Sequence, residues 1–138
     1  MKVNMEDYKT TYEKKLNEDP SPIEMSEFVI SVLDAKKAKD IKLLHVERQT
    51  VIADYFIICS GNSRTQIKSL SDEVEYKMSL EGIEPLHVEG GRGDSWILLD
   101  YGPVIVHVFG NDAREFYDLE KLYDGTSEED ISALITED

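Results

Sequence analysis

The chain has 138 residues, a formal net charge of −14, 41% hydrophobic residues and one cysteine. This length predicts a single compact domain, and the excess of acidic side chains disfavours binding to free nucleic acid through its phosphates. No stretch approaches the ~18 consecutive apolar residues of a membrane span, so the sequence predicts a cytoplasmic protein without a membrane partner. Cys59 lies within an apolar run and is expected to be a buried structural residue.

Residues 1–19 are expected to form a helical extension that precedes the domain. Their apolar residues recur at intervals of three or four, as on one face of an amphipathic helix: Met5, Tyr8, Tyr12 and Leu16. A strong helix start follows at Ser21, with Pro22 at the first helical position and Glu24 three residues after the cap. This second helix is predicted to run to about Lys39.

Two strands are predicted next, over 41–46 and 53–60. The second is apolar at nearly every position, which is typical of a central strand covered on both faces. After Gly61 and Asn62, Ser63 and Gln66 form an S-x-x-Q capping box, and the helix that they start is expected to stop at Gly82.

The rest of the domain is predicted to be a three-stranded meander and a final helix. The expected strands are 86–89, 95–101 and 104–109, and the last two form a hairpin around Gly102 and Pro103. The final helix begins at Asn111 or Asp112, with Phe116, Leu119 and Leu122 on one side. This order predicts an α/β (α+β) domain over 20–125, with a mixed sheet of about five strands and flanking helices.

The last fifteen residues, 124–138, carry six acidic side chains and no basic one. We expect residues 126–138 to be an acidic tail, which either solubilises the protein or adds contacts to a basic partner. Ile131, Leu134 and Ile135 favour at most one or two weak helical turns there. The charge of the whole chain favours a basic protein partner.

The turn at residues 60–63, SGNS, has the outline of a phosphate-binding loop between a strand and a helix. It has one glycine, and Lys68 lies a full turn into the helix, so the P-loop pattern fails. Asp54 and Asp100 are single carboxylates without the D-x-D spacing that two-metal chemistry needs. A nucleotide-binding or nucleotidyltransferase-like enzyme that uses this turn remains the alternative function.

The three histidines provide no recognisable metal site or catalytic set. His45, His87 and His107 each lie in a different predicted strand, without the closely spaced second ligand that zinc sites usually have. We expect them to be structural, and we expect neither a metal nor a cofactor.

Six aromatic residues lie between Trp96 and Tyr123, and these favour a protein-binding surface. Alternation along the strand at 95–101 places Trp96, Leu98 and Asp100 on one face, and Ile97, Leu99 and Tyr101 on the other. An equally simple alternative is that all of these side chains fill the core.

Four stretches in this order resemble the ribosomal silencing factor family, also called RsfS or Iojap: IADYFIICSGNSRTQIKSLSDEVE, PLHVEG, SWILLDYGPVIVHVF and REFYDLEKLY. The resemblance implies a nucleotidyltransferase-like topology without catalytic residues, and therefore no enzyme activity. It implies a factor that binds the fourteenth protein of the large ribosomal subunit and blocks association with the small subunit. Translation is then repressed when nutrients are limiting, and a role in large-subunit biogenesis is also implied.

The resemblance further implies a homodimer and a protein-binding surface made of Trp96, Leu98, Asp100, Tyr101, His107, Arg114, Tyr117 and Leu119. The chain departs from the family where Tyr123 follows Leu122, because the family commonly has tryptophan there. A dimeric scaffold for another cytosolic protein is a third hypothesis.

Overall fold

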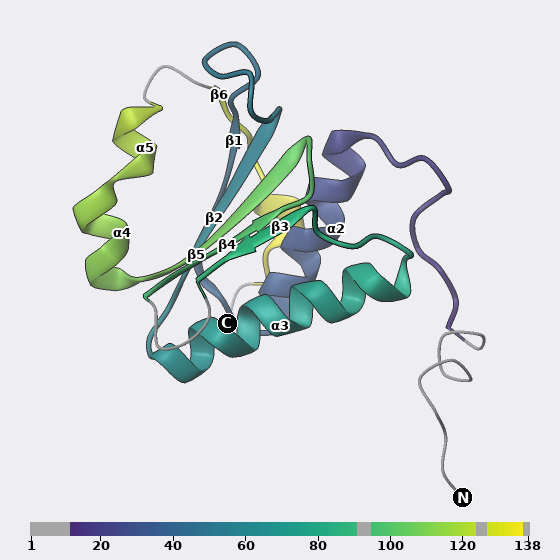
Figure 1. Ribbon diagram of the computed structural model, residues 1–138, viewed down its shortest axis with the longest axis horizontal. Helices are drawn as coiled ribbons and strands as arrows, with labels where there is room; N and C mark the ends of the chain where they lie inside the picture. Colours follow the sequence, from purple (N-terminus) through teal and green to yellow (C-terminus); the bar gives the residue numbers. More distant parts are fainter. Residues whose placement is uncertain (1–11, 91–94, 124–126, 137–138) are drawn as a thin grey trace, which may run out of the picture.

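The computed structural model describes residues 12–90, 95–123 and 127–136 (Figure 1). Its elements are α2 (Pro22–Ala35), β1 (Lys39–His45), β2 (Tyr55–Gly61), α3 (Arg64–Leu80), β3 (His87–Glu89), β4 (Trp96–Asp100), β5 (Val104–Gly110), α4 (Asn111–Tyr117), α5 (Leu119–Leu122), β6 (Ser127–Glu128) and the 3₁₀ turn η1 (Ser132–Leu134). The strands form one sheet in the order β3-β4-β5-β2-β1-β6. β2 and β5 run parallel and the other neighbours antiparallel, which confirms the predicted mixed sheet.

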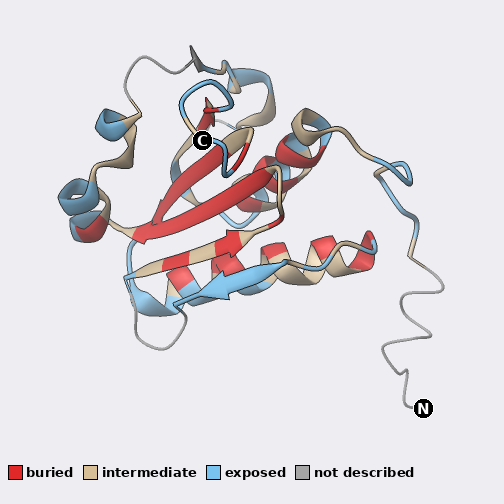
Figure 2. Cartoon of the chain, turned by 45° about the horizontal axis from the view of Figure 1, so that its top comes forward, coloured by how far each residue is buried: buried red, intermediate tan, exposed pale blue. Residues whose placement is uncertain are grey.

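Helices cover both faces of this sheet. α2 and α3 lie together on one face, and the short helices α4 and α5 lie on the other (Figure 1). The central strands β2 and β5 are buried along almost their whole length (Figure 2), as their continuous apolar sequence predicts. The sheet therefore separates a large core under α2 and α3 from a smaller core under α4 and α5.

Both predicted helix starts are confirmed. The Ser21 hydroxyl accepts a hydrogen bond from the Glu24 amide at 3.2 Å, and the Glu24 carboxylate accepts one from the Ser21 amide at 3.0 Å. The Ser63 hydroxyl accepts from the Gln66 amide at 3.0 Å, and the Gln66 side chain accepts from the Asn62 amide. Ser21 and Glu24 thus form a full capping box, whereas at Ser63 the Gln66 side chain bonds the amide one residue before the cap.

The two long helices end in the same way. Gly82 has a φ of +83°, and the Ile83 amide donates back to the Met78 carbonyl at 2.9 Å, which confirms the predicted end of α3. α2 ends at Ala35, about four residues before the predicted position. The cause is Lys37, which takes a φ of +63° and lets the Ala38 amide bond the Leu33 carbonyl. A lysine in this position gives no signal in the sequence, because glycine is the usual residue there.

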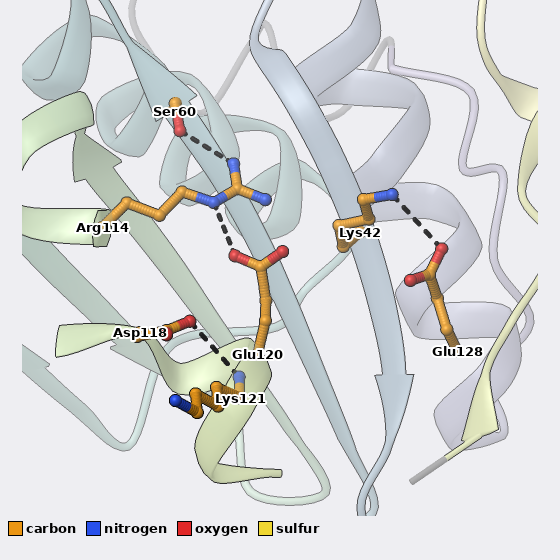
Figure 3. Close-up of polar contacts among 7 residues, drawn as sticks. All are labelled: Lys42, Ser60, Arg114, Asp118, Glu120, Lys121 and Glu128. Carbon is orange, nitrogen blue, oxygen red and sulfur yellow. Dashed lines mark hydrogen bonds and ion pairs between the residues drawn. The ribbon is translucent and has the colours of Figure 1, made fainter. Parts of the chain in front are cut away.

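The predicted final helix is divided in two. Asp118 has a φ of +46°, and its side chain accepts a hydrogen bond from the Lys121 amide at 3.3 Å, so it ends α4 and caps α5 (Figure 3). Because the chain changes direction there, Phe116 and Leu122 do not share one buried side with Leu119. Leu119 packs on the smaller core, whereas Phe116 and Leu122 are exposed.

Most of the predicted N-terminal helix, including Met5 and Tyr8, lies outside the described residues. From residue 12 to residue 16 the chain is irregular. The amides of Lys15 and Leu16 donate to the Glu81 carboxylate at 2.9 and 2.7 Å, so they are not available for helical hydrogen bonds.

Residues 127–136, which were expected to be part of an acidic tail, pack along the domain. β6 pairs antiparallel with β1, and the Glu128 carboxylate accepts from Lys42 at 3.3 Å (Figure 3). Beyond β6, three partly buried side chains pack against the large core: Ile131, Leu134 and Ile135. We call residues 127–136 the C-terminal strap. It adds a sixth strand to the predicted sheet.

Candidate protein-binding surface

β4 places Trp96 and Leu98 on the face of the sheet that α4 and α5 cover. Trp96 lies opposite Phe109 of β5, and Leu98 lies opposite His107. The alternate residues of β4 point the other way and are buried against α2 and α3, as the alternation predicts. Trp96 and Leu98 are only partly buried, because they lie at the margin of the smaller core.

The indole of Trp96 is held by three neighbours. Its Nε1–H donates to Nδ1 of His107 at 3.2 Å. Its ring centroid lies 4.8 Å from that of Phe109 in a nearly stacked arrangement, and 4.6 Å from the ring of Tyr117 on α4. Aromatic pairs at these separations contribute about 0.5–1.5 kcal/mol beyond their area burial. The orientation of Trp96 is therefore set by β5 and α4 together.

Further large apolar side chains are exposed on α4 and α5. The ring of Phe116 lies 5.1 Å from that of Tyr117, and Phe116 itself is 81% exposed. Leu122 on α5 is 72% exposed. We call this set the α4–β4 surface; it comprises Trp96, Leu98, Phe116, Tyr117 and Leu122. Exposed aromatic residues in contact with one another are typical of protein interfaces.

Arg114 fastens the helical part of this surface to the sheet. Its Nη1 donates to the hydroxyl of Ser60 on β2 at 2.8 Å, and its Nε donates to the carboxylate of Glu120 on α5 at 2.8 Å (Figure 3). The Arg114 side chain is largely buried. One guanidinium therefore joins β2, α4 and α5, which is a geometry that lysine cannot reproduce.

The charges around the α4–β4 surface are mostly negative. Residues 111–122 carry two basic side chains, Arg114 and Lys121, and four acidic ones: Asp112, Glu115, Asp118 and Glu120. Because Arg114 is already paired with Glu120, the surroundings of the exposed aromatic rings favour a cationic partner.

The structure brings together only part of the predicted binding set. Tyr101 is 5% exposed and lies among the buried residues under α2 and α3, so its placement on the binding surface is corrected. Burial, with Glu75 and Glu84 nearby, raises the pKa of its phenol. Strand alternation alone separates Tyr101 from Trp96.

Four further members of the predicted set have internal roles. His107 is 4% exposed and accepts the hydrogen bond from the Trp96 indole. Arg114 donates hydrogen bonds to Ser60 and Glu120. Asp100 accepts a hydrogen bond from the Gly102 amide at 2.8 Å, which stabilises the hairpin turn. Leu119 packs in the smaller core. Of the predicted residues, Trp96, Leu98 and Tyr117 are therefore the ones that belong to the α4–β4 surface.

Sequence reasoning did not include Phe116 or Leu122 in the predicted binding set, and it placed both with Leu119 on one side of a single continuous helix. The break at Asp118 changes this assignment. An aspartate in the left-handed conformation is uncommon, and nothing in the local pattern marks it as a helix end. The one available signal was the unusual density of aromatic residues.

The SGNS turn adjoins a shallow depression of about 280 Å³ at the carboxyl ends of β2 and β5. A Cβ at Gly61 would lie 3.1 Å from the side chain of Ile67, so a larger residue there would require Ile67 to shift. Among the described residues that line the depression, Arg64 is the basic one and Asp112 the acidic one, and Lys68 does not belong to this lining. The described lining therefore lacks the paired carboxylates that two-metal phosphoryl transfer needs.

His45, His87 and Cys59, which could have metal-binding or catalytic roles, lie apart from one another and make structural contacts. Among the described residues, no group of three or more His, Cys, Asp or Glu side chains is arranged to hold a metal ion. His45 stacks on Tyr55 with ring centroids 4.6 Å apart, and His87 contacts Glu89 at 2.9 Å. Cys59 is fully buried, and burial raises the pKa of its thiol to about 12, which makes it a poor nucleophile.

The fold and this surface define the chain as a small α/β domain that carries an exposed aromatic surface. No helix within the described ranges has the length and apolar character needed to cross a bilayer. A family model described as "Ribosomal silencing factor during starvation" matches residues 19–138, and the chain belongs to this family. The match includes the C-terminal strap.

Individual relatives agree with this family. The ribosomal silencing factor RsfS of Halalkalibacterium halodurans is 34% identical over 113 residues, which cover 82% of this chain and 97% of that protein. The Bacillus subtilis protein of the same name is 42% identical over 90 residues, covering 65% of this chain and 76% of that one. A mouse protein named "Mitochondrial assembly of ribosomal large subunit protein 1" is 30% identical over 112 residues, which are 79% of this chain and 49% of that protein.

Solved structures show the same fold. The crystal structure of protein CV0518 from Chromobacterium violaceum matches with a TM-score of 0.73 and 31% identity, covering 81% of this chain and 92% of that chain. A crystal structure from Bacillus halodurans matches with a TM-score of 0.66 and 36% identity, covering 72% and 93%.

Proposed function

We propose that this protein silences ribosomes by occupying a surface of the large ribosomal subunit and thereby blocking association with the small subunit. The partner we propose is the fourteenth protein of the large subunit, which family resemblance implies. The observation that carries the proposal is the α4–β4 surface, where Trp96, Tyr117 and Phe116 form a continuous series of ring contacts that ends in solvent. Such clusters supply most of the binding energy of protein interfaces.

The mechanism that we propose is occlusion, without chemistry or a cofactor. An acidic factor is repelled by the ribosomal RNA around its target and attracted to a basic protein patch within it. Charge thus selects the orientation, and the apolar side chains provide the affinity. The bacterial relatives favour a site of action in the cytoplasm, and the effects that follow are repression of translation under nutrient limitation and participation in large-subunit biogenesis.

The direct test is sucrose-gradient sedimentation with separated ribosomal subunits. The protein is expected to sediment with the large subunit and to reduce the fraction of joined ribosomes when the small subunit is added. Sedimentation with the small subunit, or an unchanged fraction of joined ribosomes at saturating protein, would contradict the proposal.

A matched pair of leucines tests the surface itself. Leu122 is 72% exposed within the α4–β4 surface, and Leu86 is 76% exposed before β3, at the opposite end of β4 from Trp96. Leu122→Ala and Phe116→Ala are expected to weaken binding to the large subunit without a loss of folding, whereas Leu86→Ala is expected to bind as the wild type does. Equal binding by all three variants would exclude this surface.

We also propose that a second copy covers the α4–β4 surface when the protein is away from the ribosome. Two copies would bring their acidic surroundings together, so salt should strengthen the homodimer by screening this repulsion. Sedimentation equilibrium at low and high salt measures the effect. A monomer at both salt concentrations would contradict the homodimer and leave ribosome binding untouched.

A further inference from the structure

We infer that His107 is a positioning residue that fixes the indole of Trp96 before binding, so that Trp96 presents only carbon to its partner. The group that meets Trp96 is then an aliphatic or cationic side chain of the partner protein, and not a hydrogen-bond acceptor. This inference rests on the proposed function as regards the partner, but its structural half concerns the free protein alone.

The hydrogen bond between the two residues has only one possible direction. An indole nitrogen can only donate, so Nδ1 of His107, 3.2 Å from Nε1 of Trp96, must be the unprotonated nitrogen that accepts. The imidazole is therefore neutral and carries its proton on Nε2. Burial supports this state, since it lowers the pKa of His107 to about 3.

The second ring nitrogen of His107 lowers the stability of the folded protein, because it is buried without a hydrogen bond in the described part of the chain. Nε2 of His107 is buried, and among the described residues it has no hydrogen-bond partner. Its neighbour is the ring of Phe56, with centroids 4.8 Å apart and the planes 70° from parallel. A folded protein with a buried histidine that has one unpaired nitrogen is less stable than the same protein with an apolar residue of that shape. The core thus contains a polar group whose one hydrogen bond is made to Trp96.

The hydrogen bond to His107 determines which atoms Trp96 exposes. Its only polar atom is directed inward to His107, while the rings of Phe109 and Tyr117 lie 4.8 and 4.6 Å away. The exposed remainder of the side chain is aromatic carbon. Such a surface attracts aliphatic groups and, through its π face, lysine or arginine. Because the indole of Trp96 is already fixed in the free protein, binding does not carry the entropic cost of ordering this side chain.

Nuclear magnetic resonance of the free protein tests the positioning role. Trp96 is the only tryptophan, so a single indole N–H resonance reports on this hydrogen bond. We expect the resonance of the wild type to be shifted and slow to exchange with solvent. In His107→Leu it should move toward the position for water-exposed indole and exchange faster, while the backbone spectrum of β4 and β5 is preserved. Fast exchange in the folded wild type would overturn the positioning role.

Binding to purified large ribosomal subunits tests the chemistry of the partner. Trp96→Ala is expected to weaken binding by about 30-fold or more, as for an interface hot spot. His107→Leu should weaken it by about two- to tenfold, through lost positioning. The decisive variant combines Trp96→Phe with His107→Leu, which removes donor and acceptor together and should remain within about tenfold of the wild type.

If the double variant loses as much affinity as Trp96→Ala, the indole N–H donates to the partner and the inference about partner chemistry is wrong. If the wild type does not bind large subunits at all, the proposed function fails, but the indole resonance still decides whether His107 positions Trp96. The two failures are therefore distinguishable.

Discussion

The carboxylate of Asp34, near the end of α2, accepts hydrogen bonds from both the amide and the hydroxyl of Thr136, 102 residues further along the chain. The amide lies 3.1 Å from each carboxylate oxygen, and the hydroxyl lies 2.8 Å from one of them. This contact anchors the far end of the C-terminal strap, whose near end pairs with β1. The strap therefore contributes to the stability of the domain.

Removal of residues 127–138 is expected to lower the free energy of unfolding by about 3 kcal/mol. The reason is the loss of three partly buried apolar side chains from the large core, namely Ile131, Leu134 and Ile135, at roughly 1 kcal/mol for each half-buried residue. Urea unfolding measures the change. Thr136→Ala, which leaves the apolar residues in place, should cost less than the deletion; equal losses would mean that the apolar contacts contribute nothing.

Arg114→Ala is expected to lower the free energy of unfolding by about 2 kcal/mol and to weaken ribosome binding. The substitution leaves the hydroxyl of Ser60, which is buried on β2, without its donor, and it releases Glu120 on α5. Arg114→Lys should recover only part of the stability, because one ammonium cannot reach both acceptors in the same geometry. Full recovery with lysine, measured by urea unfolding, would show that charge alone matters at this position.

Ser63→Ala is expected to cost about 1 kcal/mol of unfolding free energy, because the amide of Gln66 at the start of α3 loses its acceptor. Ser63→Asp provides the matched control, since aspartate caps helices about as well as serine. Thermal unfolding of both variants measures the difference. Equal losses of stability in the two variants would mean that the size of the residue at position 63, and not its hydrogen bond to the Gln66 amide, determines the stability of the turn.

His107 makes stability depend on pH. Burial lowers its pKa from 6.5 to about 3, so between these values the unfolded chain binds a proton that the folded chain does not. Stability is therefore greatest above about pH 6.5 and falls as the pH drops, by roughly 2 kcal/mol between about pH 7.5 and 5. His107→Leu should have a shallower dependence over this range. Urea midpoints at each pH measure this, and identical slopes in wild type and His107→Leu would contradict it.

Local patterns predicted most of the fold because each depends on residues close together in the chain. Ser21 and Glu24 form a complete capping box within four residues, and the Ser63 hydroxyl caps the Gln66 amide over the same spacing. The apolar run in β2 required burial on both faces wherever the strand was placed. The family resemblance was carried by ordered stretches of sequence, and the family match confirms it.

The predictions that were wrong concern segments in which a contact with a distant residue outweighs the local sequence pattern. Lys15 and Leu16 lie in an amphipathic pattern, yet their amides are bound by Glu81, about 65 residues away. The acidic composition of the C-terminal strap is typical of a solvated tail. The strap is nevertheless ordered, because β6 pairs with the edge of β1 and three apolar side chains pack against the large core. Neither partner can be recognised from the segment itself.

By itself, the sequence determined the mixed α/β class, the helix starts, the buried central strand and the family, because periodicity and capping act over a few residues. Only the tertiary structure decided which aromatic residues are exposed. The left-handed Asp118 turns Phe116 and Leu122 outward, and the packing of α2 and α3 on one face of the sheet buries Tyr101 there. The hydrogen bond from Trp96 to His107 depends on the pairing of β4 with β5, in which Leu98 and not Trp96 lies opposite His107. Its diagonal geometry follows from strand register and side-chain direction together, and no local pattern specifies both.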